Sequence, residues 1–145
     1  MNIRKVTAAD RTLFLELMNE FYHSEAVLHP VPVEFMERSF AELTRSEEYL
    51  TAFLLEKADT VGGYALLSRS YSPEAGGIVI WLEELYLRPA FRGQGLGSAF
   101  LEYMKEQVPA ARYRLEVEPD NDRAKALYRR HGFEIFPYQQ MKCGD

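Results

Sequence analysis

The segment Arg92–Gly97, with the sequence RGQGLG, carries the strongest chemical signal in this chain of 145 residues. Glycines have no Cβ, so a ligand can approach their backbone closely, and they adopt φ values that other residues avoid. Amides at the start of a helix attract negative charge, and the helix dipole adds to this attraction. Arg92 contributes a planar cation that matches phosphate oxygens. The segment therefore predicts a cradle for a pyrophosphate group.

Two familiar phosphate-binding loops fit this segment poorly. A P-loop requires Lys before the Ser or Thr that follows its last glycine, whereas Ser98 follows Gly97 directly. A dinucleotide-binding turn requires glycine in place of Ser98 and a strand that runs straight into the glycines, but residues 88–91 intervene. The remaining alternative is a strand-to-helix turn that binds nothing, and three alternating glycines beside an arginine argue against it.

A pair of carboxylates, Glu83 and Glu84, interrupts the apolar strand that begins at Ile78. A carboxylate in such a place is costly unless it is paired or used, and perturbed ionisable groups gather at functional sites. One glutamate could deprotonate an incoming ammonium and the other could attract it. Strand alternation predicts that the two side chains point to opposite faces. The alternative is plain solvation at the strand end, or a salt bridge to an arginine.

The elements that must hold these residues follow from apolar periodicity. Strands are predicted at 2–6, 49–56, 61–71, 78–87 and 113–117, with a last strand or hairpin within 133–141. Helices are predicted after the capping signature at residues 7–10, from near Pro32, from Leu96 to Val108, and from Asp120 or Asn121 to about His131. The result is a mixed α/β (α+β) domain over residues 1–145, with a parallel strand–helix–strand crossover at 78–117.

Composition narrows the class of protein. The chain has 17 Lys and Arg against 22 Asp and Glu, a net charge of −5, which argues against a nucleic-acid binder driven by bulk charge. Cys143 is the single cysteine, so an intrachain disulfide and a cysteine-based zinc site are excluded, and the three histidines lack metal-ligand spacing. No long apolar run or leader-like start is present, so we expect a cytoplasmic protein without a membrane partner.

Two segments together resemble one family. Residues 85–97 (LYLRPAFRGQGLG) resemble the acetyl-CoA-binding motif of the GNAT family of N-acetyltransferases, in which Arg/Gln-x-x-Gly-x-Gly/Ala follows a central strand. Residues 121–133 (NDRAKALYRRHGF) resemble the downstream signature of the same family. The resemblance covers nearly the whole chain. It implies a mixed, mostly antiparallel sheet of six to seven strands, about four helices, and a parallel pair of strands that splay apart at the cofactor site.

The resemblance implies acetyl-CoA as cosubstrate, no metal, and direct attack of a primary amine on the thioester through a tetrahedral intermediate. It assigns the pyrophosphate to the backbone of Arg92–Ser98, the acetyl group and pantetheine arm to the backbone of Leu85 and Leu87, and the thioester region to Asn121. The cofactor-binding residues are then Leu85, Tyr86, Leu87, Arg92, Gly93, Gln94, Gly95, Leu96, Gly97, Ser98, Asn121, Ala124, Lys125 and Tyr128. Lys125, Arg129 and Arg130 are candidates for the 3′-phosphate, or else a solvated helix face.

Tyr128 matches the general acid of the family. A phenol can protonate the leaving thiolate, and the backbone N–H of Leu85 can stabilise the oxyanion. Without the surrounding motif, Tyr128 would be equally well explained as a core residue. On the acceptor side the resemblance points to His23 and Glu25, with a solvated loop as the alternative, and to Glu83 and Glu84.

The identity of the acceptor is open. The sequence Trp81–Tyr86 is similar to the acidic strand of polyamine-type members such as spermidine/spermine N-acetyltransferase, which favours a small cationic amine such as a polyamine or a lysine-like compound. The alternatives are an aminoglycoside-type or protein N-acetyltransferase and a non-catalytic acyl-CoA-binding sensor. A homodimer is a further expectation, with Phe136 and Tyr138 as candidate interface residues.

Overall fold

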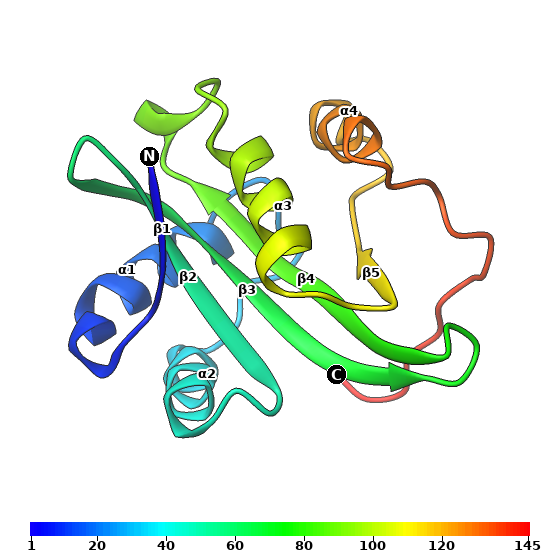
Figure 1. Ribbon diagram of the computed structural model, residues 1–145. Coiled ribbons are helices and arrows are strands. Elements are labelled where there is room, and N and C mark those ends of the chain that lie inside the picture. Colours follow the sequence, from blue (N-terminus) through cyan, green and yellow to red (C-terminus); the bar gives the residue numbers. More distant parts are fainter.

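The computed structural model describes all residues from Met1 to Asp145 and contains one five-stranded sheet (Figure 1). Its strands are β1 (Asn2–Lys5), β2 (Leu50–Lys57), β3 (Thr60–Ser72), β4 (Gly77–Leu87) and β5 (Arg112–Leu115), which lie in chain order across the sheet. Neighbouring strands are antiparallel except β4 and β5, which are parallel. The predicted mixed, mostly antiparallel sheet is confirmed.

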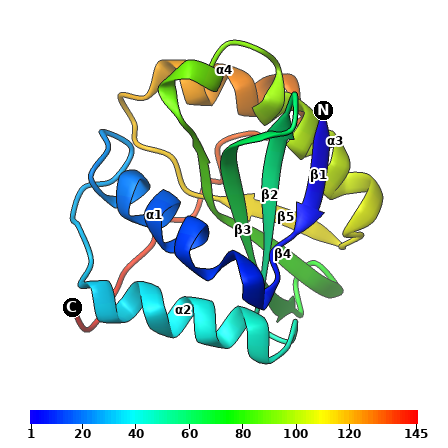
Figure 2. The ribbon, with the colours of Figure 1, turned by 90° about the vertical axis from the view of Figure 1, so that its left-hand side faces the viewer.

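Four α-helices flank the sheet: α1 (Arg11–Tyr22), α2 (Val33–Arg45), α3 (Leu96–Gln107) and α4 (Asp122–Arg130). The short 3₁₀ helices η1 (Ala8–Asp10) and η2 (Pro89–Phe91) precede α1 and the loop to α3. Helices α1 and α2 cover one face of the sheet and α3 covers the other, while α4 follows beyond the end of β5 (Figures 1 and 2). None of the helices is both long and apolar enough to cross a membrane.

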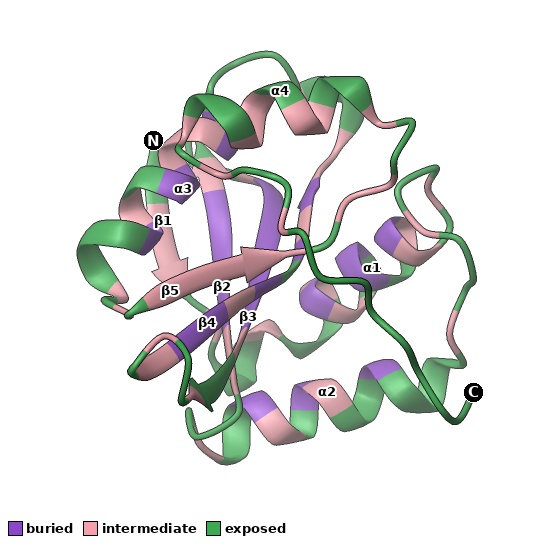
Figure 3. Cartoon of the chain, turned by 90° about the vertical axis from the view of Figure 1, so that its right-hand side faces the viewer, coloured by how far each residue is buried: buried purple, intermediate pink, exposed green.

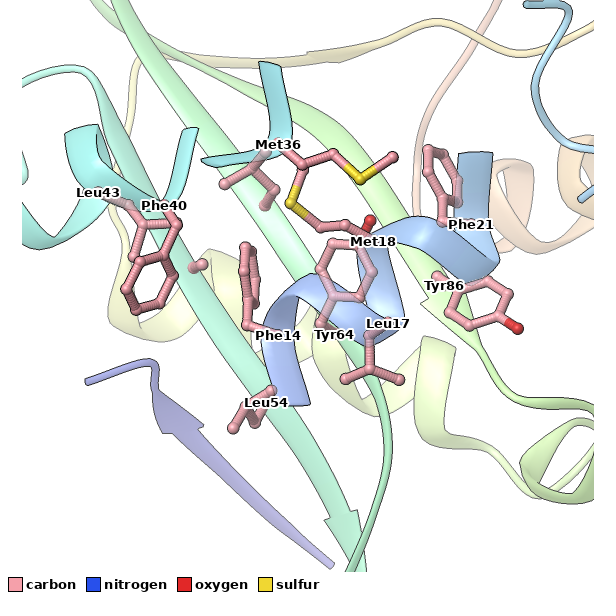
Figure 4. Close-up of a cluster of buried hydrophobic side chains, with 12 residues drawn as sticks. Phe14, Leu17, Met18, Phe21, Met36, Phe40, Leu43, Leu54, Tyr64 and Tyr86 are labelled. Atoms are coloured by element: carbon pink, nitrogen blue, oxygen red, sulfur yellow. The ribbon is translucent and has the colours of Figure 1, made fainter. Parts of the chain in front are cut away.

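Two apolar clusters fill the space between the helices and the sheet. Alternate residues of β2 and β3 belong to opposite clusters: Leu54 and Tyr64 pack with α1 and α2, whereas Phe53 and Ala65 pack with α3. Both faces of these strands are covered, which explains why their sequences are apolar almost without interruption. The apolar stripe predicted for α1 is buried and faces the cluster that contains Leu54 and Tyr64, as Phe14 in Figure 4 illustrates.

The predicted helix ends are supported by hydrogen bonds. The Thr7 amide donates to Asp10 Oδ2 at 2.8 Å before α1, and the Ala124 amide donates to Asn121 Oδ1 at 3.1 Å at the start of α4. Gly132 follows α4 with φ +88°, a conformation that a residue without Cβ adopts at little cost. Asn121, rather than Asp120, is therefore the cap of α4.

The strands β4 and β5 separate before β4 ends. Val79–Leu82 pair with Arg112–Leu115, whereas β4 continues beside β3 as far as Leu87. Residues 83–87 consequently have no strand on their β5 side. This is the predicted splayed parallel pair, and it opens the sheet at the point where the two glutamates lie.

The prediction of six to seven strands is wrong, because the last strand is missing. Residues 133–141 form no strand and are largely exposed (Figure 3). The ring of Phe136 is instead held beside β5 by two cations, with the Cζ atoms of Arg112 and Arg114 at 5.2 and 4.8 Å from its centroid. Pro137 follows and has no N–H to donate to a neighbouring strand. Tyr138 is exposed in this tail.

Candidate active site

The loop between η2 and α3 has the backbone shape of an anion cradle. Gly93 and Gly95 have φ values of +72° and +83°, in the left-handed region that favours glycine. No heavy atom lies within 4 Å of the position that a Cβ on Gly95 would take, so this side of the loop is open. A ligand can therefore reach the backbone here without meeting a side chain.

The amides at the start of α3 are available to such a ligand. The first bond of the helix runs from the Ala99 amide to the Gly95 carbonyl at 2.9 Å, so the amides of Leu96, Gly97 and Ser98 have no acceptor in the helix. A Cβ on Gly97 would lie 3.4 Å from Leu127 Cδ2, which shows how closely α4 packs on α3 at this point. The aligned amides and the helix dipole together fit a pyrophosphate group.

Side chains around the cradle hold its shape. Arg92 Nε donates a hydrogen bond to the Leu87 carbonyl at 2.9 Å. The side chain of Gln94 accepts a hydrogen bond from Lys57 Nζ at 2.6 Å and donates one to the Ala90 carbonyl at 2.8 Å. Ser98 Oγ lies 2.5 Å from His131 Nε2. The amide group of Gln94 is thus occupied within the protein, whereas Arg92 keeps its terminal guanidinium nitrogens free for an anion.

The basic residues of α4 lie in different surroundings. Lys125 Nζ donates to the Pro119 carbonyl at 2.8 Å. Lys125 and Arg129 both line a cavity that is bounded by β5, α4 and the C-terminal residues. This cavity is distinct from the one described next. Arg130 is exposed. Arg123, whose position in the sequence carries no signal of its own, has its Nη2 4.0 Å from the Cβ position of Gly93. None of the other three basic residues lies within 4 Å of that position.

A cavity of about 570 Å³ lies where β4 and β5 separate. Its walls come from the end of α1 and the loop after it, from residues 82–85 of β4, from residues 116–119 after β5, and from the first turns of α4. Leu85, Asn121, Ala124 and Tyr128, which are all among the predicted cofactor-binding residues, line it. Tyr86 does not, because its side chain packs in the α1 cluster and its hydroxyl donates to Glu20 at 3.0 Å.

Glu83 and Glu84 both line this cavity, although alternation along a strand predicts opposite faces. The reason is a β-bulge. Leu66 of β3 pairs with Glu84 and Leu67 pairs with Leu82, so Glu83 is an extra residue without a partner. Leu82 consequently packs in the apolar cluster on the α3 side of the sheet. Glu84 points to the other side, where it accepts a hydrogen bond from Tyr64 of the cluster beneath α1. Bulges are common beside active sites because they re-aim side chains in this way.

The two glutamates differ in environment. Glu84 is only 6% exposed, and each of its oxygens accepts a hydrogen bond from a phenol: Tyr22 donates to Oε2, and Tyr64 donates to Oε1 at 2.7 Å. Burial raises the pKa of the Glu84 carboxyl above its ordinary value, and the nearby charge of Glu83 acts in the same direction. Glu83 is exposed and accepts a hydrogen bond from Ser68 Oγ at 2.7 Å.

Tyr128 lines the same cavity from α4, whereas the two glutamates line it from β4. No protein group is hydrogen-bonded to its hydroxyl, and its ring packs edge-on against Phe133 with a centroid distance of 5.9 Å. Burial raises the pKa of this phenol. The hydroxyl therefore stays protonated at neutral pH and can donate a proton to a leaving group.

The loop after α1 contributes other residues than those predicted. His23 Nδ1 lies 2.7 Å from the Asn19 carbonyl, and Glu25 is exposed; neither lines the cavity. The lining comes instead from Tyr22 and from residues 26–29. Tyr22 was missed because it lies beside the apolar stripe of α1, where a tyrosine at a helix end carries little signal of its own. No group of three or more His, Cys, Asp or Glu side chains is arranged to hold a metal ion.

Comparison with family models matches residues 13–133 to the acetyltransferase (GNAT) family. This chain belongs to the GNAT family. A crystal structure described as a probable acetyltransferase is similar in fold, with a TM-score of 0.84 and 22% identity over 100% of this chain and 99% of that one. Both findings agree with the mixed, mostly antiparallel sheet and flanking helices described above.

Two curated proteins are similar in sequence. The Mycobacterium leprae protein ML0378 is 29% identical over 91% of this GNAT chain and 34% of its own length. Thialysine N-epsilon-acetyltransferase of Bos taurus is 39% identical over 50% of this chain and 44% of its own length. The chain thus spans less than half the length of either of these relatives.

Proposed function

We propose that this protein is an N-acetyltransferase that moves an acetyl group from acetyl-CoA to a primary amine. The observation that carries the proposal is that Tyr128, Glu83 and Glu84 line one cavity at the splayed end of β4 and β5. Such an arrangement places a proton donor and proton acceptors around one reacting centre. The anion cradle at the start of α3 lies at the same end of the sheet, which supports acetyl-CoA as the cosubstrate.

Each part of the site has a role in this reaction. Acetyl-CoA supplies a thioester whose carbonyl carbon is attacked by a neutral amine and whose thiolate then leaves. The amides of Leu96–Ser98 and the guanidinium of Arg92 bind its pyrophosphate, and Arg123 approaches from α4. Backbone N–H groups around Leu85 that face the β5 side of β4, where no strand pairs, are suited to stabilise the oxyanion that attack creates. Tyr128 donates the proton that the thiolate needs.

The charges of the cavity favour a cationic acceptor. Its lining includes Glu83, Glu84, Glu116 and Glu118 and contains no lysine or arginine. Four carboxylates around one opening attract ammonium groups and disfavour anionic acceptors. The likeness to a protein named thialysine N-epsilon-acetyltransferase supports the same class of acceptor. A polyamine or a lysine-like compound is the acceptor that we propose.

A panel of acceptors tests this proposal. Release of free CoA from acetyl-CoA is measured with spermidine, thialysine, lysine, an aminoglycoside, a lysine-containing peptide and a neutral aromatic amine. We expect the small cationic amines to give the highest kcat/KM. A preference for the neutral amine would contradict a cationic acceptor. Binding of acetyl-CoA without CoA release for any amine would favour a non-catalytic sensor instead.

A further inference from the structure

We propose that Tyr22 takes the proton from the acceptor amine and passes its own phenolic proton to Glu84. Tyr22 is then a catalytic residue, and Glu84 is a proton acceptor that acts through it without touching the acceptor. This inference rests on the proposed acetyl transfer and concerns how its amine becomes neutral.

Glu84 lines the cavity, yet it is poorly placed to bind the acceptor directly. Both oxygens of Glu84 are already bonded to phenols, one to Tyr22 and one to Tyr64, and the residue is 6% exposed. Tyr22 is the last residue of α1, is half-buried and lines the cavity. Tyr64 is fully buried and does not line it. Tyr22 is therefore the phenol that both an acceptor and Glu84 can reach.

The hydrogen-bonding capacity of a phenol supports a relay. Tyr22 has one O–H, and that hydrogen is directed to Glu84. The lone pairs of the same oxygen remain free to accept a hydrogen bond from an ammonium group. When the ammonium N–H proton moves to the Tyr22 oxygen, the original phenolic proton moves to Glu84. The products are a neutral amine, a neutral Tyr22 and a protonated Glu84, so protons and charge balance.

The surroundings of Glu84 suit it to this task. The ionisable groups that face it are Tyr22 from α1, Tyr64 from β3 and Glu83 beside it in β4, and none of them is a cation. Burial raises the pKa of Glu84, and this effect outweighs the hydrogen bonds from the two phenols, which lower it. The ionised form of Glu84 is therefore a stronger proton acceptor than an exposed carboxylate. Burial and the charge of Glu84 also raise the pKa of Tyr22, so Tyr22 keeps a proton to pass on.

The chain offers a matched pair of variants. Tyr22→Phe and Tyr64→Phe each remove one phenol donor from Glu84, but only the first alters the cavity wall. With spermidine, we expect Tyr22→Phe to lower kcat by about 10²-fold or more and Tyr64→Phe to lower it by less than about tenfold. Acetyl-CoA affinity and the far-UV circular dichroism spectrum should be retained in Tyr22→Phe.

An acceptor that is already neutral gives the decisive readout. A trifluoro-substituted ethylamine needs no deprotonation at neutral pH, so its turnover should be nearly the same in wild type and Tyr22→Phe. Equal losses in the two variants, or a Tyr22→Phe loss that is the same for both acceptors, would overturn the relay and assign Tyr22 a structural role. If the wild type acetylates no amine at all, the proposed function fails, and the relay fails with it.

Discussion

Glu83 and Glu84 are consecutive residues of β4, yet both side chains line the same cavity, because the β-bulge at Glu83 shifts the strand by one residue. One carboxylate is exposed and bonded to Ser68, and the other is buried between two phenols. An exposed charge attracts a cation over some distance, whereas a buried carboxylate has a raised pKa and accepts a proton more readily. The bulge thus provides two carboxylates with different properties at one site.

The exposed carboxylate leads to a prediction about affinity. Glu83→Gln should raise KM for a polyamine several-fold and change kcat little, because the attraction acts before the chemical step. The effect should shrink as salt is added, since salt screens exposed charges. Steady-state kinetics at low and high ionic strength measure this. An unchanged KM at low salt would show that Glu83 does not attract the acceptor.

The phenol of Tyr128 leads to a prediction about turnover. Tyr128→Phe should lower kcat by about 10²- to 10⁴-fold while leaving acetyl-CoA affinity nearly unchanged, because only a proton donor is removed. Tyr113→Phe is the matched control, since the Tyr113 hydroxyl donates to the Val108 carbonyl at 2.7 Å and lies outside the acceptor cavity. Turnover of Tyr128→Phe at the level of this control would remove Tyr128 from the mechanism.

The cradle leads to a prediction about cosubstrate affinity. Gly95→Ala forces a residue with Cβ into φ +83°, which costs about 1–2 kcal/mol. Gly76→Ala carries the same strain at φ +74° in the turn between β3 and β4, and both positions have open space around a Cβ. Thermal unfolding should show similar destabilisation of the two variants. The KM for acetyl-CoA should rise, by about tenfold, only in Gly95→Ala; a similar rise in both would argue against this cradle.

The ion pair between Arg4 and Asp10 leads to a prediction about acid stability. Arg4 donates two hydrogen bonds to Asp10, at 2.9 and 3.0 Å, and these bonds lower the pKa of Asp10 to about 2. The folded-state pKa lies below the unfolded one. The ionised carboxylate therefore stabilises the fold above about pH 4, and the contribution is lost as pH falls toward 2.

Urea unfolding at several pH values measures this contribution. Asp10→Asn should reduce the free energy of unfolding at pH 7 by about 1–2 kcal/mol, a value that allows for the partial exposure of Arg4. The gap between wild type and variant should close toward pH 2. The control Glu37→Gln removes an exposed 3.6 Å contact with Arg11 and should change stability by less than about 0.5 kcal/mol. A gap that stays constant with pH would rule out the ion pair as its source.

The sequence predicts the parts of this protein that depend on local pattern. The glycine loop at Arg92–Gly97 and the position of Tyr128 are set within a few residues of chain, and the motifs locate them. The apolar stripe of α1 and the continuous apolar character of β3 likewise predict their elements, because burial on one or both faces leaves a direct trace in residue type.

The features that the sequence does not reveal depend on contacts between distant segments. The bulge at Glu83 arises from its register with Leu66 and Leu67, which no periodicity of β4 alone discloses. The bond from Tyr22 to Glu84 joins residues that are far apart in the chain. The expected strand near Phe136 is lost to cation–π contacts with β5. Each of these is a tertiary effect that overrides local preference.

The central claim, acetyl transfer to a cationic amine at this cavity, is tested most directly by mass spectrometry of the acceptor. The full chain is incubated with acetyl-CoA and spermidine, and the reaction is repeated with Tyr128→Phe. We predict N-acetylated spermidine and an equal amount of free CoA with the wild type, and a small fraction of that rate with the variant. Intact acetyl-CoA and unmodified spermidine, with acetyl-CoA binding demonstrated by calorimetry, would contradict the claim.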